Sequence, residues 1–346
     1  MKAIAITGQG GIERVQYIDV ARPQIGPREV LIQTHAVALN RLDIFVRNNL
    51  DSFQLAPPHV SGADGAGMVA EVGNEVRTVE VGDRVLINPG LNCGVCEFCQ
   101  AGEQSLCVRF GIMGETCPGT FGEYFKVPQD NVHPVPEGFS WEEAAAFPLV
   151  FLTAWRMLIS KAQIKPGEDI LILGIGGGVS TAALQIAKAI GLRAFVTSSS
   201  DEKLQQARKL GADAVINYNT QDFAREVRNL THRRGVDVVV DSVGGDSYAK
   251  SLASLVKGGR LVTCGATAGP RPQTDLQRIF WNQLSVFGST MGNMREFAEM
   301  LNFVRKRGVK PVIDQVFPLA DGAKAMARME AGKQFGKIVL TVSDGV

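Results

Sequence analysis

Four cysteines crowd into a short segment of the chain at regular spacing. Cys93, Cys96, Cys99 and Cys107 follow the pattern C-x2-C-x2-C-x7-C. Four thiolates in a tetrahedron are a preferred structural site for Zn²⁺, and short C-x2-C loops bring thiolates together at little entropic cost. Such a site leaves no coordination position open to a substrate. The spacing predicts one structural zinc ion, with four unligated cysteines or two disulfides as the alternatives.

A glycine-rich turn between an apolar strand and an apolar helix is the second chemical feature. Residues 170–173 have the character of a buried parallel strand, and residues 179–190 place apolar side chains at helical spacing. The glycines between them are Gly174, Gly176, Gly177 and Gly178. A phosphate binds the exposed amides at such a helix start. We therefore expect these glycines and the amide of Val179 to hold a dinucleotide pyrophosphate; the alternative is a turn that only closes a tight loop.

The bulk properties fit a soluble enzyme with about two domains. The chain has 346 residues, of which 45% are hydrophobic and 21% charged. A net charge of +1 gives no field that would attract nucleic acid or an anionic membrane. The N-terminus is too short and strand-like for a signal peptide, and no apolar run approaches the roughly 20 residues of a membrane span. We expect a cytoplasmic protein, in which clustered cysteines favour metal over disulfides.

The pattern of the chain changes near residue 150. Before it, short β-like runs alternate with turns, at 15–20, 29–34, 67–72 and 84–87, followed by helical segments at 141–147 and 152–159. After it, helices and strands alternate. The expected strands are 170–173, 193–197, 214–216, 236–241, 260–264, 284–290, 312–316 and 336–341; the expected helices are 179–190, 203–210, 222–231, 247–255, 295–307 and 320–331. This alternation predicts an α/β fold with a parallel sheet covered on both faces.

Several motifs together resemble the medium-chain dehydrogenase/reductase superfamily over essentially the whole chain. Besides the glycine turn they are GADGAG at 62–67, VGDRV at 81–85, GTFGEY at 119–124, Thr153-Ala154 and GKIVL at 336–340. The resemblance implies a GroES-like, mainly-β catalytic domain at 1–148, whose four-cysteine lobe (about 90–108) holds structural zinc. It also implies a Rossmann NADP-binding domain, a doubly wound parallel sheet, at 149–291 and a return to the catalytic domain at 292–346. Its edge strand at 284–290 implies a homodimer or homotetramer.

The catalytic zinc ion of the alcohol dehydrogenases in this superfamily is held by a Cys, a His and a second Cys. The resemblance places these ligand positions at Asn40, Ala63 and Leu149 or its neighbours. None of these residues supplies the expected donor. The alternative is a metal site rebuilt from other side chains, namely Asp43, Asp64 and His59.

Without a Lewis acid, a simple ketone is hard to polarise, whereas a conjugated carbonyl spreads the charge that hydride addition creates. Zinc-free quinone oxidoreductases and enoyl or alkenal reductases of the superfamily carry V-N-x-x-D at the first-ligand position, which Asn40 and Asp43 match within LNRLD. The resemblance implies that Asn40 reaches the reacting carbonyl and that Thr153 lies near the nicotinamide and phosphates. The chain differs from these branches by keeping the four-cysteine lobe and by lacking the Tyr that some of them use.

Residues after the second strand of the cofactor domain indicate which nicotinamide binds. An acid there would bind the ribose 2′-hydroxyl of NADH, but Ser198 and Ser199 occupy this place. In NADPH-linked relatives a Lys one turn on and a Tyr after the next strand contact the 2′-phosphate, and Lys203 and Tyr218 match them. We expect NADPH rather than NADH; a capped turn and a solvated lysine are the alternative.

Three further residues are assigned to the cofactor. Cys264 and Gly265 follow a strand and are expected to border the nicotinamide, and Lys337 in GKIVL resembles a cofactor-proximal basic residue. An exposed lysine on a terminal strand is the alternative for Lys337.

The leading hypothesis is an NADPH-dependent reductase of activated C=C bonds or quinones with a small hydrophobic substrate. The alternatives are an alcohol or aldehyde dehydrogenase of the same superfamily and a non-catalytic NADPH-binding protein.

Overall fold

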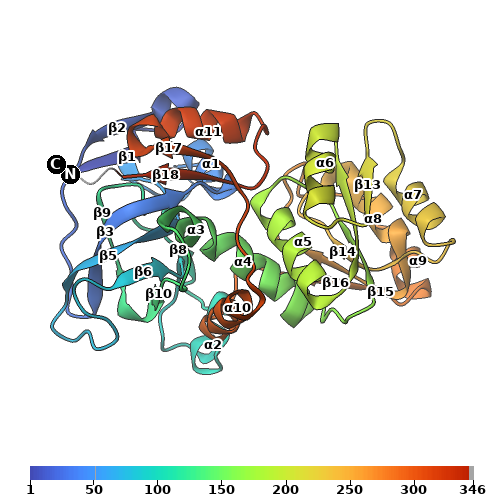
Figure 1. Cartoon of the computed structure of the whole chain (residues 1–346), viewed down its shortest axis with the longest axis horizontal. Coiled ribbons are helices and arrows are strands. Elements are labelled where there is room, and N and C mark those ends of the chain that lie inside the picture. The colour runs from blue at the N-terminus through green and yellow to red at the C-terminus, as the bar shows by residue number, and fades with distance from the viewer. Residues whose placement is uncertain (51, 343–346) are drawn as a thin grey trace. The chain divides into compact units, whose positions relative to one another are not determined.

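The computed structural model describes residues 1–50 and 52–342 and divides into two compact units (Figure 1). Unit 1 comprises Met1–Leu149 and Asn293–Val346, and unit 2 comprises Val150–Gly292. The C-terminal segment thus returns to the unit in which the chain begins. Among the described residues, no helix combines the length and apolarity that a membrane crossing needs.

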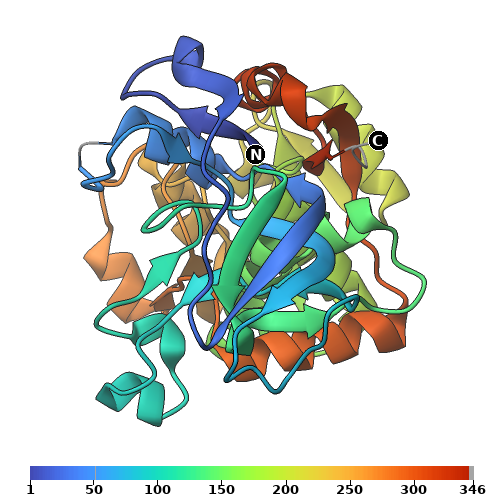
Figure 2. The ribbon, with the colours of Figure 1, turned by 90° about the vertical axis from the view of Figure 1, so that its left-hand side faces the viewer.

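Unit 1 is built on a seven-stranded sheet in the order β10-β6-β5-β3-β18-β17, with β9 paired to β3. Its strands are β3 (Glu29–Ala38), β5 (Asp64–Val72), β6 (Arg84–Ile87), β9 (Tyr124–Pro128), β10 (Val132–Pro134), β17 (Ile313–Pro318) and β18 (Lys337–Thr341). Figure 2 faces this unit, with β3 in blue beside β9 in green. A Cβ atom at Gly67 would collide with the Gln33 carbonyl, so glycine is what allows β5 to approach β3 there.

Smaller elements complete unit 1. A three-stranded sheet contains β1 (Lys2–Ile6), β2 (Val15–Asp19) and β4 (His59–Val60), and a two-stranded sheet contains β7 (Gly90–Leu91) and β8 (Gly111–Ile112). The helices are α1 (Arg41–Asn48), α2 (Glu97–Gln100), α3 (Trp141–Ala146), α10 (Met294–Arg307) and α11 (Gly322–Glu330). Apolar residues of β1, β3, α11 and β18 form one core cluster, and β3, β5, β6 and β9 supply much of another.

Unit 2 is a doubly wound α/β fold. Its six parallel strands follow the order β13-β12-β11-β14-β15-β16. The strands are β11 (Asp169–Ile172), β12 (Arg193–Ser198), β13 (Ala214–Asn217), β14 (Val236–Val240), β15 (Leu255–Thr263) and β16 (Ser285–Gly288). The helices are α4 (Pro148–Trp155, whose first two residues belong to unit 1), α5 (Gly178–Ile190), α6 (Asp201–Lys209), α7 (Phe223–Leu230), α8 (Tyr248–Ser254) and α9 (Leu276–Trp281).

The strand order of unit 2 reverses beside β11. Right-handed crossovers therefore place α5 and α6 on one face of the sheet and α7 and α8 on the other, as Figure 1 shows. Ligands of such folds bind at the carboxyl ends of the strands at this switch point, where β11 runs into the glycine turn. The α/β fold class is confirmed, with one mainly-β unit and one doubly wound unit.

Candidate functional site

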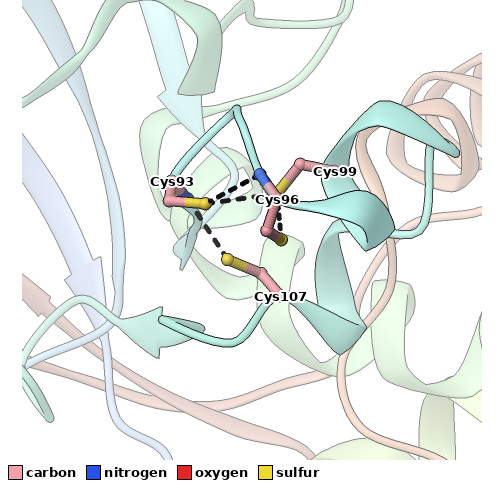
Figure 3. Close-up of side chains that lie close together, drawn as sticks. All are labelled: Cys93, Cys96, Cys99 and Cys107. Atoms are coloured by element: carbon pink, nitrogen blue, oxygen red, sulfur yellow. Dashed lines mark hydrogen bonds between the residues drawn. The ribbon is translucent and has the colours of Figure 1, made fainter.

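The four cysteine thiols converge on one point in a lobe of unit 1 (Figure 3). Their sulfur atoms all lie within 4.8 Å of one another. The Cys96 Sγ–Cys99 Sγ distance is 3.6 Å and the Cys93 Sγ–Cys99 Sγ distance is 3.9 Å. A tetrahedron with Zn–S bonds of about 2.3 Å has sulfur atoms about 3.8 Å apart, so the thiols fit a zinc ion. All six cysteines of the chain are free thiols, which disfavours the disulfide alternative.

Backbone amides of the lobe donate hydrogen bonds to two of these thiols. Hydrogen bonds from the amides of Val95 and Cys96 lower the pKa of the Cys93 thiol to about 6. The Cys107 sulfur accepts hydrogen bonds from the amides of Cys93 and Arg109, each 3.3 Å long. In contrast, burial and then the neighbouring thiols raise the pKa of Cys99 to about 12. A divalent cation bound between the four thiols would favour their thiolate forms, and would therefore lower the raised pKa of Cys99.

A second cluster, the carboxylate–lysine cluster, consists of Asn40, Asp43, Asp64 and Lys337. Asn40 follows β3 and precedes α1, whose first turn contains Asp43. Asp64 begins β5, and Lys337 begins β18. Because β5 and β18 flank β3 on its two sides, the three strands deliver these residues to the same end of the sheet. All four side chains are buried.

Hydrogen bonds join the cluster into one network. The Lys337 ammonium donates to Asn40 Oδ1 at 2.6 Å and to Asp64 Oδ2 at 2.9 Å. Asn40 Nδ2 donates to the same Asp64 oxygen at 2.9 Å, and Asp64 Oδ1 accepts from the Leu149 amide at 2.9 Å. Asp43 Oδ2 accepts from the Asn40 amide at 2.7 Å. Burial raises the pKa of Asp43 to about 7, against the lowering effect of the Asn40 amide and Lys337.

This cluster does not fit a catalytic zinc ion. Of the three ligand positions, Asn40 is bound to an ammonium group, Ala63 has no donor, and Leu149 contributes its backbone amide. The alternative metal site of Asp43, Asp64 and His59 does not form either. Asp64 pairs with Lys337, and His59 Nε2 lies 2.9 Å from the Gly114 carbonyl. Within residues 1–50 and 52–342, metal-ligating side chains gather in threes or more only at the four cysteines.

The glycine turn of unit 2 presents open backbone to a ligand. Gly174 and Gly176 have φ angles of 64° and 113°, which only glycine adopts at low cost. The N-cap residue of α5 is Gly177, which has no side chain to accept hydrogen bonds from the first amides of the helix, and the first turn of α5 carries no acid. The Ser180 hydroxyl donates to the Gly174 and Gly177 carbonyls and holds the turn. Uncapped amides at a helix start fit a dinucleotide pyrophosphate, with Gly178 and Val179 in the first turn.

The residues expected to select NADPH lie around this turn and the end of β12. The Lys203 side chain lies against Gly176, since a Cβ there would be 3.4 Å from Lys203 Nζ. Ser198 ends β12 and is buried, Ser199 is exposed, and Tyr218 follows β13 with its amide bonded to the Ser198 carbonyl. The nearest acid after β12, Asp201, accepts a hydrogen bond from Asn217.

The remaining predicted cofactor residues also lie in unit 2. Thr153 is buried on α4, with its hydroxyl 3.7 Å from Met291 Sδ. Gly265 follows β15, where its carbonyl accepts from the Thr263 hydroxyl. Cys264 is partly buried, and desolvation of its thiol raises the pKa of that thiol to about 12, so it is an inert thiol at neutral pH.

Asp64 and Lys337 make contacts that their sequence motifs did not predict. Asp64 bonds to Lys337, Asn40 and Leu149, although the sequence marked it only as a neighbour of a lost ligand position. Lys337 is 4% exposed, so the alternative of an exposed lysine on a terminal strand is wrong. The signal in the sequence was a lysine opening an otherwise apolar strand.

Comparison with known proteins agrees with this architecture. A family model described as the alcohol dehydrogenase GroES-like domain matches residues 26–137, and one described as zinc-binding dehydrogenase matches residues 178–306. A crystal structure of an NAD-dependent alcohol dehydrogenase is 43% identical, with a TM-score of 0.95 over 99% of this chain and 100% of that chain.

Curated relatives match over nearly the full length. A zinc-type alcohol dehydrogenase-like protein of Leptosphaeria maculans is 34% identical over 93% of both chains. A quinone oxidoreductase of Pseudomonas aeruginosa is 31% identical over 98% of this chain and 99% of its own. The chain therefore belongs to the medium-chain dehydrogenase/reductase superfamily, as an oxidoreductase of the zinc-type alcohol dehydrogenase-like group.

Proposed function

We propose that this protein is an NADPH-dependent reductase of activated C=C bonds, such as those of enones, enals and enoyl thioesters, or of quinones. The observation that carries the proposal is the carboxylate–lysine cluster, which forms where the three positions that match catalytic-metal ligands hold Asn40, Ala63 and Leu149. Two local features support the proposal: unit 2 contains the glycine turn that fits a coenzyme pyrophosphate, and unit 1 contains buried hydrogen-bonding groups.

The chemistry follows from where negative charge develops. A bound nicotinamide supplies a hydride. Reduction of a plain carbonyl puts a full charge on one oxygen, which a metal ion stabilises best. In a conjugated carbonyl the charge is delocalised over the enolate, so fixed hydrogen-bond donors in a site of low dielectric suffice. A site built of an ammonium group, an amide and two carboxyl groups suits the second reaction.

An alcohol dehydrogenase is the second candidate, because the 43% identical solved structure is that of an NAD-dependent alcohol dehydrogenase. Product identity separates the two. The pure protein is incubated with NADPH and a conjugated enal, and the product is identified by NMR. A saturated aldehyde supports alkene reduction, whereas an allylic alcohol overturns it in favour of carbonyl reduction. NADPH binding without turnover of a broad panel of enals, enones and quinones would indicate a non-catalytic role.

The coenzyme preference is tested with Lys203→Ala. Loss of a charge-assisted hydrogen bond to the 2′-phosphate costs about 1.5–3 kcal/mol, so we expect KM for NADPH to rise roughly 10- to 100-fold. KM for NADH, which lacks that phosphate, is expected to stay within about twofold. The matched control is Lys209→Ala, an exposed lysine on the same helix. Equal changes in KM for NADPH and for NADH would contradict the assignment of Lys203 to the 2′-phosphate.

The edge of the unit 2 sheet supports a homodimer or homotetramer. Among the strands of the described residues, β16 pairs with β15 alone and forms an edge of the sheet, and Val286 on it is 41% exposed. The preceding helix α9 exposes large apolar side chains: Leu276 (70%), Phe280 (65%) and Trp281 (72%). An apolar edge of this kind is a template for pairing with a second copy. Light scattering at micromolar concentration is expected to give the mass of two or four chains; the mass of one chain would exclude this assembly.

A further inference from the structure

Lys337 is an unusual residue for its place in the fold. It begins β18, which continues with the apolar residues Ile338, Val339 and Leu340, and its side chain is almost completely buried. Its partner Asp64 is fully buried as well. A buried ion pair loses so much hydration that apolar side chains of similar volume often stabilise a fold equally well. Stability of the sheet therefore gives no reason for a lysine here.

Asn40 and Lys337 differ in whether they have a hydrogen free to donate to a ligand. Both amide hydrogens of Asn40 are used, by Asp64 Oδ2 and by the Ala38 carbonyl at 3.4 Å, and its oxygen accepts from Lys337. Asn40 therefore has no hydrogen to offer a substrate without breaking a buried bond. The ammonium of Lys337 uses two hydrogens, on Asn40 and Asp64, and has no third partner within residues 1–50 and 52–342.

The location of the ammonium group is the second observation. It contacts Asn40, which holds the first of the three positions that match metal ligands. It also contacts Asp64, which follows the second position, Ala63, and whose other oxygen binds the backbone of the third, Leu149. A fixed cation thus lies among the residues that replace a metal ion's ligands.

We propose that Lys337 is the catalytic electrophile of this protein, held in place by Asn40 and Asp64, and that its third hydrogen binds the carbonyl oxygen of the substrate. This proposal rests on the proposed reduction of conjugated carbonyl compounds. Asn40 is then a positioning residue that fixes the ammonium group.

The β-carbon of the substrate receives the hydride and forms a C–H bond, and the C=C π pair moves to give an enolate. Lys337 donates a hydrogen bond to the enolate oxygen and keeps its proton. The α-carbon then takes a proton from water, so that the substrate gains two electrons and two hydrogens while the nicotinamide is oxidised.

The test compares Lys337→Met, which removes the charge, with Lys337→Arg, which keeps it. The control is Lys324→Met, which removes an exposed lysine of unit 1 that pairs with Asp321 at 2.7 Å. If the methionine variant fails to fold because Asp64 is left unpaired, the double variant Lys337→Met/Asp64→Asn removes both charges. The readouts are kcat and KM for an enone, the Kd of NADPH, and the absorption maximum of the push–pull enal 4-dimethylaminocinnamaldehyde bound together with NADP⁺.

We expect Lys337→Met to lower kcat by about 10²- to 10³-fold, the usual effect of losing an oxyanion donor, and to leave the Kd of NADPH within about threefold. The bound enal is expected to absorb at longer wavelength than the free one in the wild type and in Lys337→Arg, but not in Lys337→Met. A kcat within threefold of wild type with weakened NADPH binding would overturn the proposal in favour of a coenzyme anchor. If the wild type forms no saturated product, the proposed function fails, and the absorption shift still decides whether Lys337 polarises a carbonyl.

Discussion

Replacing Cys99 by serine is expected to remove the zinc ion and to destabilise the four-cysteine lobe. The lobe has little else to hold it, because α2 is four residues long and Val95, Leu106 and Val108 are more than half exposed. Structural zinc sites contribute about 10–16 kcal/mol of apparent binding free energy in isolated peptides, and small lobes without an apolar core depend on them for folding. We expect zinc content to fall from one ion per chain to below about 0.2, and Tm to fall by roughly 5–10 °C, which corresponds to about 2–3 kcal/mol for a protein of this class.

The matched control for this change is Cys117→Ser. Cys117 is a partly buried free thiol outside the lobe, 3.7 Å from Met113 Sδ, and the same sulfur-to-oxygen change there is expected to leave the zinc content at one ion per chain. Zinc is measured by mass spectrometry after gel filtration, and Tm by calorimetry. Zinc retained by Cys99→Ser, or two ions per wild-type chain, would contradict the site as described.

The four-cysteine cluster and the glycine turn were predictable because each depends on local sequence. Cysteine spacing determines which thiols can converge, and the thiols do converge. A buried strand, a glycine turn and an apolar helix are contiguous, and β11 and α5 form within about a residue of the predicted ranges. The alternating helices and strands of unit 2 likewise follow from periodicity that a two-faced parallel sheet imposes on the chain.

The parts that sequence alone did not predict depend on contacts between distant segments. The turn after β3 forms α1 because Asp43 accepts the Asn40 amide and the helix packs its apolar face, which short-range patterns did not indicate. The segment expected to be helical, 152–159, is helical, but only its first half belongs to α4, and Arg156–Lys161 continues it as a π-helix that periodicity did not indicate. Lys337 pairs with Asn40, 297 positions away, and with Asp64, 273 positions away, and the placement of β18 and β5 on either side of β3 brings them together.

The raised pKa of Asp43 leads to a second large effect, on the pH dependence of stability. The pKa is about 7 in the folded protein, mainly because of burial, and 3.8 is the value for an unperturbed carboxyl group. Between these values the folded state holds a proton that the unfolded state has lost, so Asp43 makes the fold less stable as pH rises from about 4 to 7. The total loss in the free energy of unfolding is about 4 kcal/mol, of which about 2 kcal/mol falls between pH 5.5 and 8.

The Asp43→Asn variant removes this titration while its amide oxygen still accepts the Asn40 amide. The free energy of unfolding of Asp43→Asn relative to wild type is therefore expected to rise by about 2 kcal/mol from pH 5.5 to pH 8, measured by denaturant titration of both proteins at each pH. The control is Asp237→Asn, because Arg234 and the Asp169 amide lower the pKa of Asp237 against burial, so that it stays ionised in both states across this range. The difference in the free energy of unfolding between Asp237→Asn and wild type should not change with pH. A constant difference for Asp43→Asn as well would mean that Asp43 is ionised in the folded protein, and the carboxylate–lysine cluster would then carry a net negative charge at pH 5.5 as it does at pH 8.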